Sequence, residues 1–233
     1  MEVTSAERAT RRREHFSFSV TVNLKRGKEW LCSMILPVPY RKQVTESSCF
    51  PACIRMVLRF YGDDVDERWL WMRGILLPEH TGTWDVTLAP VLKSSGYDSV
   101  SYSSGSINGW STTVPLKTRE KYKELYRRGI RDGSLTHRRN ASLQLIKKYL
   151  SRGIPVLAEV NADVFYGMKC GWTHMVVIVG CSKNFFYVHD PDKHMGGKFL
   201  RVSVSRFRAS WEKLSSLVSK SMFVIFRRRE RKL

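Results

Sequence analysis

Short hydrophobic runs in the second half of the chain have the length and composition of β-strands. Each is rich in β-branched or aromatic residues and is bounded by turn-forming residues. The runs lie at 155–160, 174–179, 184–190 and 222–226. Two further apolar runs, 16–22 and 30–36, flank a Lys-Arg-Gly-Lys turn and predict a β-hairpin near the amino terminus. The second half is therefore expected to form an antiparallel sheet.

The segment between these two regions has the patterns of helices. A dense apolar stretch begins at Cys49, has Pro51 in its first turn and stops at Gly62, and Ser47 or Ser48 is a candidate N-cap. Its density predicts a buried helix. Weaker helical patterns cover 64–77, 86–94, 118–131 and 142–151, while residues 97–114 are predicted as a short strand followed by a polar loop. Helices first and strands afterwards indicate an α+β fold.

The domain organisation follows from these patterns and from the length of 233 residues. We expect an N-terminal tail with the hairpin at 1–35, one folded domain at 36–226 and a basic C-terminal tail at 227–233. No apolar run is long enough to span a bilayer, and the first fifteen residues lack the pattern of a signal peptide. Five irregularly spaced cysteines do not form a disulfide framework, which favours a reduced, cytoplasmic setting.

The formal net charge of +19 is concentrated in two segments. Residues 115–152 contain twelve Lys/Arg against three Asp/Glu, and residues 201–233 contain ten against two. Such segregation is compatible with an anionic partner such as nucleic acid, a membrane face or an acidic substrate. We favour the other interpretation, a solvated surface that only keeps the protein soluble, because no recognised nucleic-acid motif accompanies the charge.

The start of the buried helix carries the first candidate chemistry. Cys49 lies where the helix begins, and Gln43 precedes it by six residues. A thiol at a helix N-terminus feels the positive end of the helix dipole, which favours the thiolate. Cys49 is therefore a candidate nucleophile. Cys53, one turn further on, is interpreted as a small buried apolar residue.

A second candidate constellation lies on the predicted hairpin 174–190. If its turn is centred on Ser182, His174 and Asp190 lie directly opposite each other on one face of the sheet, and His189 points to the other face. A carboxylate beside a histidine fixes the tautomer of the ring and stabilises its protonated form. Asp190 is thus placed to orient His174 and to favour its protonated form, and His174 is the candidate general base for Cys49.

Metal binding is the competing use of these residues. Cys49 and Cys53 are spaced i, i+4, and Cys170, His174 and Cys181 could add ligands. A zinc site of this kind needs ligands from several separate segments, and the chain has no C-x2-C pair. We therefore expect no metal, and we interpret Cys170 and Cys181 as ordinary thiols.

Two stretches together resemble signatures of a known family. Residues 38–62, with Gln43 and Cys49, resemble the first signature of the papain-like peptidases that cleave double-glycine leader peptides and of their stand-alone relatives. Residues 171–177, followed by Asp190-Pro191, resemble the second. The amino-acid sequence of residues 49–59 is also similar to that of the branch named guanylyl cyclase domain-containing proteins. The resemblance covers roughly residues 36–195.

The resemblance implies a papain-like fold and a cysteine peptidase that needs no cofactor. At matching positions it implies Cys49 as nucleophile, His174 as general base and acid, and Asp190 as the residue that orients His174. It implies that Gln43 and the Cys49 amide hold the oxyanion. Phe50 departs from the family, which usually has glycine there, and this leaves open whether its ring narrows or blocks the primed side of the cleft. The alternative function is a peptide- or nucleic-acid-binding module that uses the basic surface without catalysis.

Overall fold

A computed structural model describes residues 34–74, 77–78, 82–103, 115–216 and 220–228. The helices are α1 Cys49–Phe60, α2 Glu67–Gly74, α3 Asp85–Ser94, α4 Leu116–Arg131, α5 Leu143–Leu150, α6 Ala162–Tyr166 and α7 Val204–Glu212, with a 3-10 turn at Lys213–Ser216. The strands are β1 Met34–Ile35, β2 Tyr97–Ser103, β3 Thr136–Arg139, β4 Val156–Asn161, β5 Thr173–Cys181, β6 Phe185–Asp190, β7 Gly197–Ser203 and β8 Ser221–Arg227. Most of the predicted N-terminal hairpin lies outside the described residues.

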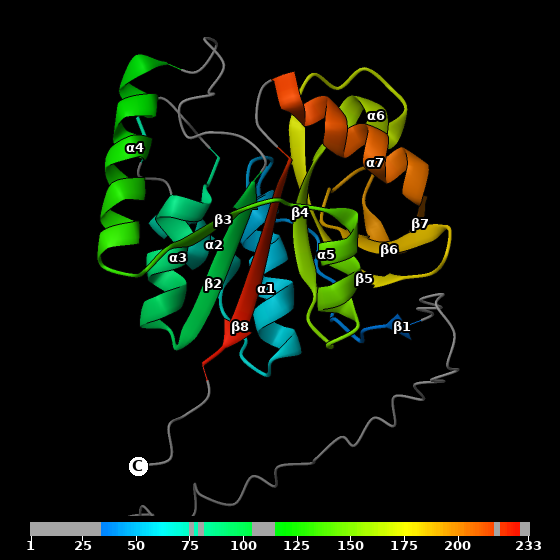
Figure 1. The fold of residues 1–233 in the computed structure, drawn as a ribbon, viewed down its shortest axis with the longest axis horizontal. Coiled ribbons are helices and arrows are strands. Elements are labelled where there is room, and N and C mark those ends of the chain that lie inside the picture. Colours follow the sequence, from blue (N-terminus) through cyan, green and yellow to red (C-terminus); the bar gives the residue numbers. More distant parts are fainter. Residues whose placement is uncertain (1–33, 75–76, 79–81, 104–114, 217–219, 229–233) are drawn as a thin grey trace, which may run out of the picture. The chain divides into compact units, whose positions relative to one another are not determined.

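The described strands form one mixed sheet in the order β3-β2-β8-β4-β5-β6-β7, and β1 pairs with β5. All neighbours are antiparallel except β2 and β3, which run parallel. In Figure 1, α1 lies behind β8, whereas α5 and α7 lie in front of the sheet. These helices contact β5 and β4, so the central strands are covered on both faces. The expected α+β fold is confirmed. The C-terminal strands pair antiparallel as expected, and β2 lies within the segment 97–114, which was predicted to begin with a short strand. The sheet is nevertheless not purely antiparallel, because β3, which was not predicted, pairs parallel with β2.

Helix α1 forms largely as its pattern predicts. Pro51 occupies the first turn, where its missing N–H is not needed, and the chain leaves the helix through Gly62 at φ 97°. The N-cap residue is Ser48, but its side chain makes no capping hydrogen bond with the helix. The expected capping by this hydroxyl is therefore wrong. The hydroxyl is instead hydrogen-bonded to Glu67 and Thr45.

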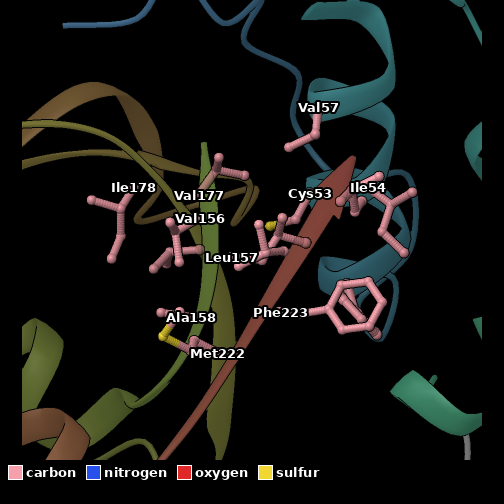
Figure 2. Packing of buried hydrophobic residues seen from close by; sticks show 14 of the residues in the cluster. Cys53, Ile54, Val57, Val156, Leu157, Ala158, Val177, Ile178, Met222 and Phe223 are labelled. Carbon is pink, nitrogen blue, oxygen red and sulfur yellow. The ribbon is translucent and has the colours of Figure 1, made fainter. Parts of the chain in front are cut away.

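The core is built between α1 and the central strands. Figure 2 shows Cys53, Ile54 and Val57 of α1 beside the sheet, with the side chains of Leu157 and Phe223 directed toward the helix. All five residues are buried, and Leu157 of β4 lies opposite Phe223 of β8 in the register. The dense apolar composition of α1 is thus explained by its position against the sheet, and the position of Cys49 at the tip of α1 is set by this packing.

Among the described residues, no helix is long and apolar enough to cross a membrane.

Candidate active site

A β-bulge sets which residues of β5 and β6 share a face. Near the turn Gly180 opposes Tyr187, whereas further along Ile178 opposes Val188, so Val179 is an extra residue of β5. The N–H of Leu36 donates to the carbonyl of Val179 at 2.7 Å. If the pairing seen near the turn continued along β5 without this extra residue, Asp190 and His174 would lie on opposite faces of the sheet. The bulge returns them to the same face.

The predicted pairing of His174 directly opposite Asp190 is wrong in register, although the two side chains do meet. Because Val177 opposes His189, Asp190 lies diagonal to His174 across the two strands. Diagonal neighbours on one face remain within reach of long side chains. Nε2 of His174 lies 2.8 Å from Oδ1 of Asp190, and both side chains are buried. The predicted partnership therefore exists, through a different register.

Asp190 is held by further hydrogen bonds from its surroundings. The hydroxyl of Tyr166 donates to Oδ2 at 2.9 Å, and the backbone N–H of Asp192 donates to Oδ1 at 3.0 Å. The hydroxyl of Tyr40 donates to the backbone carbonyl of Asp190 at 3.1 Å. Burial, with the nearby charge of Asp190, raises the pKa of Tyr166 well above its usual range, so its hydroxyl stays a donor. A fully buried carboxylate is thus supplied with donors on both oxygens.

His174 links Asp190 to Cys49. Burial of the ring pushes its pKa down, but hydrogen bonds with Asp190 and Cys49 and the charges of both outweigh this and raise the pKa to about 10. With Nε2 bonded to Asp190, Nδ1 is the ring nitrogen left to face Cys49. The imidazole is thus held in one orientation and favoured in its protonated form at neutral pH. A thiol beside such a ring is placed for proton transfer to it.

Two aromatic side chains enclose the His174 ring, and the sequence patterns did not single them out. Trp172 meets the ring edge-on at a centroid distance of 5.5 Å, and Tyr166 lies at 6.2 Å. Tyr166 is the last residue of the five-residue helix α6. Asn161 caps its start and accepts the N–H of Val164, and Gly167 caps its end with φ 76°. These cap residues were the available signal for α6.

Gln43 is buried on the loop that leads into α1. Its backbone N–H donates to the carbonyl of Pro191 at 2.8 Å, which ties this loop to the segment directly after Asp190. Its side-chain Nε2 donates to the carbonyl of Glu46 at 3.2 Å, so one of its two N–H groups is used within the loop. The loop that contains Gln43 therefore lies next to both the end of β6 and the start of α1.

Phe50, the residue after Cys49, is directed into the core. The side chain is only 4% exposed and packs edge-on against Phe223 of β8 at a centroid distance of 5.3 Å. The ring is therefore a core side chain that packs between α1 and the sheet. A large ring fits after Cys49 because this position of α1 faces the sheet.

The metal alternative finds no support in the described part of the chain, where no three His, Cys, Asp or Glu side chains gather closely enough to hold an ion. Cys53 is fully buried, and its Sγ lies 3.3 Å from the carbonyl oxygen of Met175. Burial, followed by the neighbouring Cys49, Asp190 and Glu67, raises the pKa of the Cys53 thiol well above its usual range. Cys53 is thus a protonated core residue, as its pattern indicated.

Comparison with family models decides the relationship. Residues 35–219 match the model of the Peptidase_C39 like family, which is most of the chain. The chain belongs to the C39-like peptidase family. It has the papain-like fold of that family and is a cysteine peptidase, a hydrolase that acts on peptides. No curated protein matches the chain.

Solved structures similar to this C39-like peptidase include three peptidase domains. One is the peptidase domain of Streptococcus ComA, a bifunctional ABC transporter, with 17% identity, TM-score 0.45, and coverage of 81% of this chain and 96% of that one. The second is a double-glycine motif protease from an AMS/PCAT transporter in complex with its leader peptide (14%, 0.47, 84% and 98%). The third is a C39-like peptidase from Bacillus anthracis (16%, 0.46, 83% and 98%).

Proposed function

We propose that this peptidase cleaves its substrate through an acyl-enzyme formed on Cys49. The thiolate of Cys49 attacks the scissile carbonyl, His174 then gives its proton to the leaving amine, and Asp190 keeps the imidazole oriented and charged. Water, deprotonated by His174, hydrolyses the thioester and regenerates the thiol. The observation that carries the proposal is the buried His174 ring, which is hydrogen-bonded to Asp190 at 2.8 Å and whose pKa is raised by Asp190 and by Cys49.

We further propose that Gln43 and the backbone N–H of Cys49 stabilise the tetrahedral oxyanion. Gln43 supports this role because it lies on the loop that enters α1 and keeps one side-chain N–H beyond its bond with Glu46. The N–H of Cys49 belongs to the first turn of α1, where backbone donors have no partner within the helix. Removing one oxyanion donor from an acyl-transfer enzyme costs roughly 10²- to 10³-fold in kcat.

A peptide-library experiment tests the catalytic assignment. The protein is incubated with peptides from a digested proteome, and newly formed amino termini are identified by mass spectrometry. We expect cleavages that disappear in Cys49→Ala and in His174→Ala and persist in Cys53→Ala, whose thiol belongs to the core. Cleavages that persist in Cys49→Ala, in a preparation free of other proteases, would contradict the assignment.

The same chain supports finer proposals about its relatives and setting. The amino-acid sequence of residues 49–59 supports placing this peptidase near the branch named guanylyl cyclase domain-containing proteins. We take residues 36–226 as the catalytic domain, preceded by a tail and hairpin at 1–35 and followed by the basic tail 227–233. A thiol nucleophile and an odd number of cysteines favour a reducing, cytoplasmic setting.

The basic segments 115–152 and 201–233 are proposed to hold an anionic partner or an acidic part of the substrate. Support comes from α4 and β3, where the side chains of Arg127, Arg128 and Arg131 and of Arg138 and Arg139 are exposed. Titration of the protein with single-stranded and duplex nucleic acid at several salt concentrations tests this. Neutralised phosphates predict a steep loss of affinity with salt, and absence of binding at low salt removes the proposal.

A further inference from the structure

A buried carboxylate that the proposed mechanism does not use lies beneath the loop preceding Cys49. Glu67, the first residue of α2, is only 1% exposed. Its Oε1 accepts the backbone N–H of Val44 at 2.6 Å and the hydroxyl of Ser48 at 2.7 Å. Val44 directly follows Gln43, and Ser48 directly precedes Cys49. Glu67 therefore holds both ends of the short loop between the two proposed oxyanion donors.

The loop itself is closed around Ser48. The Ser48 hydroxyl, fully buried, lies 2.9 Å from the backbone nitrogen of Thr45 and 3.1 Å from its carbonyl oxygen. At its other end the loop is anchored by the hydrogen bond from Gln43 N–H to Pro191. Two of the anchors of the loop, those at Val44 and Ser48, are therefore on Glu67. Loss of the Glu67 acceptor removes one anchor from each end of the loop, while the hydrogen bonds of Gln43 with Pro191 and of Thr45 with Ser48 remain.

Packing alone does not account for a carboxylate at this position. Within the described part of the chain, Oε2 of Glu67 is buried without a hydrogen-bond partner. A buried acceptor without a partner destabilises a fold, and apolar side chains of similar size often replace buried charges without loss of stability. Glu67 thus has an oxygen atom that is unfavourable for stability. It lies next to a site whose geometry depends on the loop that Glu67 binds.

We propose that Glu67 is a positioning residue, which holds the loop from Val44 to Ser48 so that the Gln43 carboxamide and the Cys49 N–H converge on the oxyanion. This inference rests on the proposed function and deepens it. Glu67 acts through the loop as a hydrogen-bond acceptor and does not contact the reacting atoms. Its role is therefore confined to steps that form an oxyanion.

Two probes of Cys49 separate this role from a general effect on the fold. With p-nitrophenyl acetate, the thiolate attacks the ester carbonyl through an oxyanion, a sulfur–carbon bond forms and p-nitrophenolate leaves. With iodoacetamide, the sulfur displaces iodide at a saturated carbon, and no oxyanion is formed. We expect Glu67→Ala to slow acylation by about tenfold to hundredfold and to leave alkylation within about twofold of wild type.

Matched variants complete the experiment. Glu67→Gln retains an acceptor oxygen for Val44 and Ser48, so its acylation rate should return to within about threefold of wild type. Asp66→Asn removes a carboxylate from the preceding, exposed residue, whose Oδ1 accepts the N–H of Trp69, and should change neither rate. Ser48→Ala should reproduce a part of the Glu67→Ala defect in acylation.

The outcomes are distinguishable. Equal slowing of both probes in Glu67→Ala, or no slowing of either, overturns the positioning role, and so does failure of Glu67→Gln to recover acylation. If Glu67→Ala does not fold, as judged by circular dichroism and its melting temperature, the ratio of the two rates in Ser48→Ala decides. If wild-type acylation is no faster than that of Cys49→Ala, the proposed function itself fails, and the inference fails with it.

Discussion

Replacement of Asp190 by asparagine should lower the reactivity of Cys49 about a hundredfold while leaving the fold in place. The carboxylate is fully buried and accepts hydrogen bonds from His174, Tyr166 and the N–H of Asp192. The carboxamide has nearly the same volume and keeps one acceptor oxygen. It loses the negative charge, however, so the protonated His174 ring loses its buried counter-ion.

The size of the effect follows from the pKa of His174. This pKa lies at about 10, against 6.5 for the ordinary imidazole, and the difference corresponds to about 5 kcal/mol of preference for the protonated ring. Asp190 and Cys49 both contribute through a hydrogen bond and through charge, so we assign roughly half, about 2–3 kcal/mol, to Asp190. Without Asp190 the pKa of His174 is lowered, and the protonated ring is less favoured by this amount. The stabilisation that the imidazolium gives the Cys49 thiolate is weakened accordingly, and about 2–3 kcal/mol corresponds to roughly a hundredfold.

Alkylation by iodoacetamide at pH 7 measures this without knowledge of the natural substrate. The rate is followed by mass spectrometry of the peptide that contains Cys49. Asp192→Asn is the matched control, because the Asp192 carboxylate accepts the backbone N–H groups of His194 and Met195, whereas the carboxylate paired with His174 is that of Asp190. If Asp190→Asn alkylates within about threefold of wild type while its melting temperature is unchanged, the account of His174 as a charged partner of Cys49 is refuted.

Further substitutions test other parts of the same site. Tyr166→Phe removes a donor from buried Asp190, a hydrogen bond worth about 1.5–3 kcal/mol, and should slow Cys49 acylation by p-nitrophenyl acetate about tenfold or more. Gly180→Ala places a methyl group against the backbone of β1 and should lower both the melting temperature and the acylation rate. Phe50→Ala should lower the free energy of unfolding in urea by about 3–5 kcal/mol, since it empties a core position. Because folding raises the pKa of His174 from 6.5 to about 10, its contribution to stability is complete below pH 6.5 and is lost as pH rises through 10. Urea unfolding of wild type and His174→Gln should therefore converge between these pH values, and a constant difference contradicts the assignment.

The elements that could be predicted from the sequence are those with a strong local signal. Helix α1 has dense apolar residues, a proline in its first turn and a terminal glycine, and β4, β5, β6 and β8 are short apolar runs between turn residues. The elements that were missed lack such a signal. Strand β7 is only partly buried and is defined by its pairing with β6, and β3 is a four-residue polar strand paired with β2. Exposed edge strands depend on their neighbours, which a local pattern does not contain.

The candidate site shows the same division between residue type and position. Cys49, His174, Asp190 and Gln43 could be selected because each combines a chemically suitable side chain with a recognisable local context. Tyr166 could not, because its relevance depends on α6 bringing it to Asp190 from 24 residues away. The orientation of Phe50 was likewise unavailable, since a position after a helix start faces either cleft or core according to how the helix packs.

The partnership of His174 and Asp190 depends on a feature that no count along the chain reveals. A hairpin with the pairing seen at the turn, continued without interruption, would put these two side chains on opposite faces. The extra residue, Val179, corrects this, and its carbonyl is satisfied by Leu36, just after β1. Gly180 beside it lies so close to β1 that a Cβ would meet the backbone of Met34. A two-residue strand far in sequence from His174 and Asp190 therefore supports the register on which this pair depends. Sequence reasoning reached the right pair through the wrong register because both registers keep the two side chains on one face.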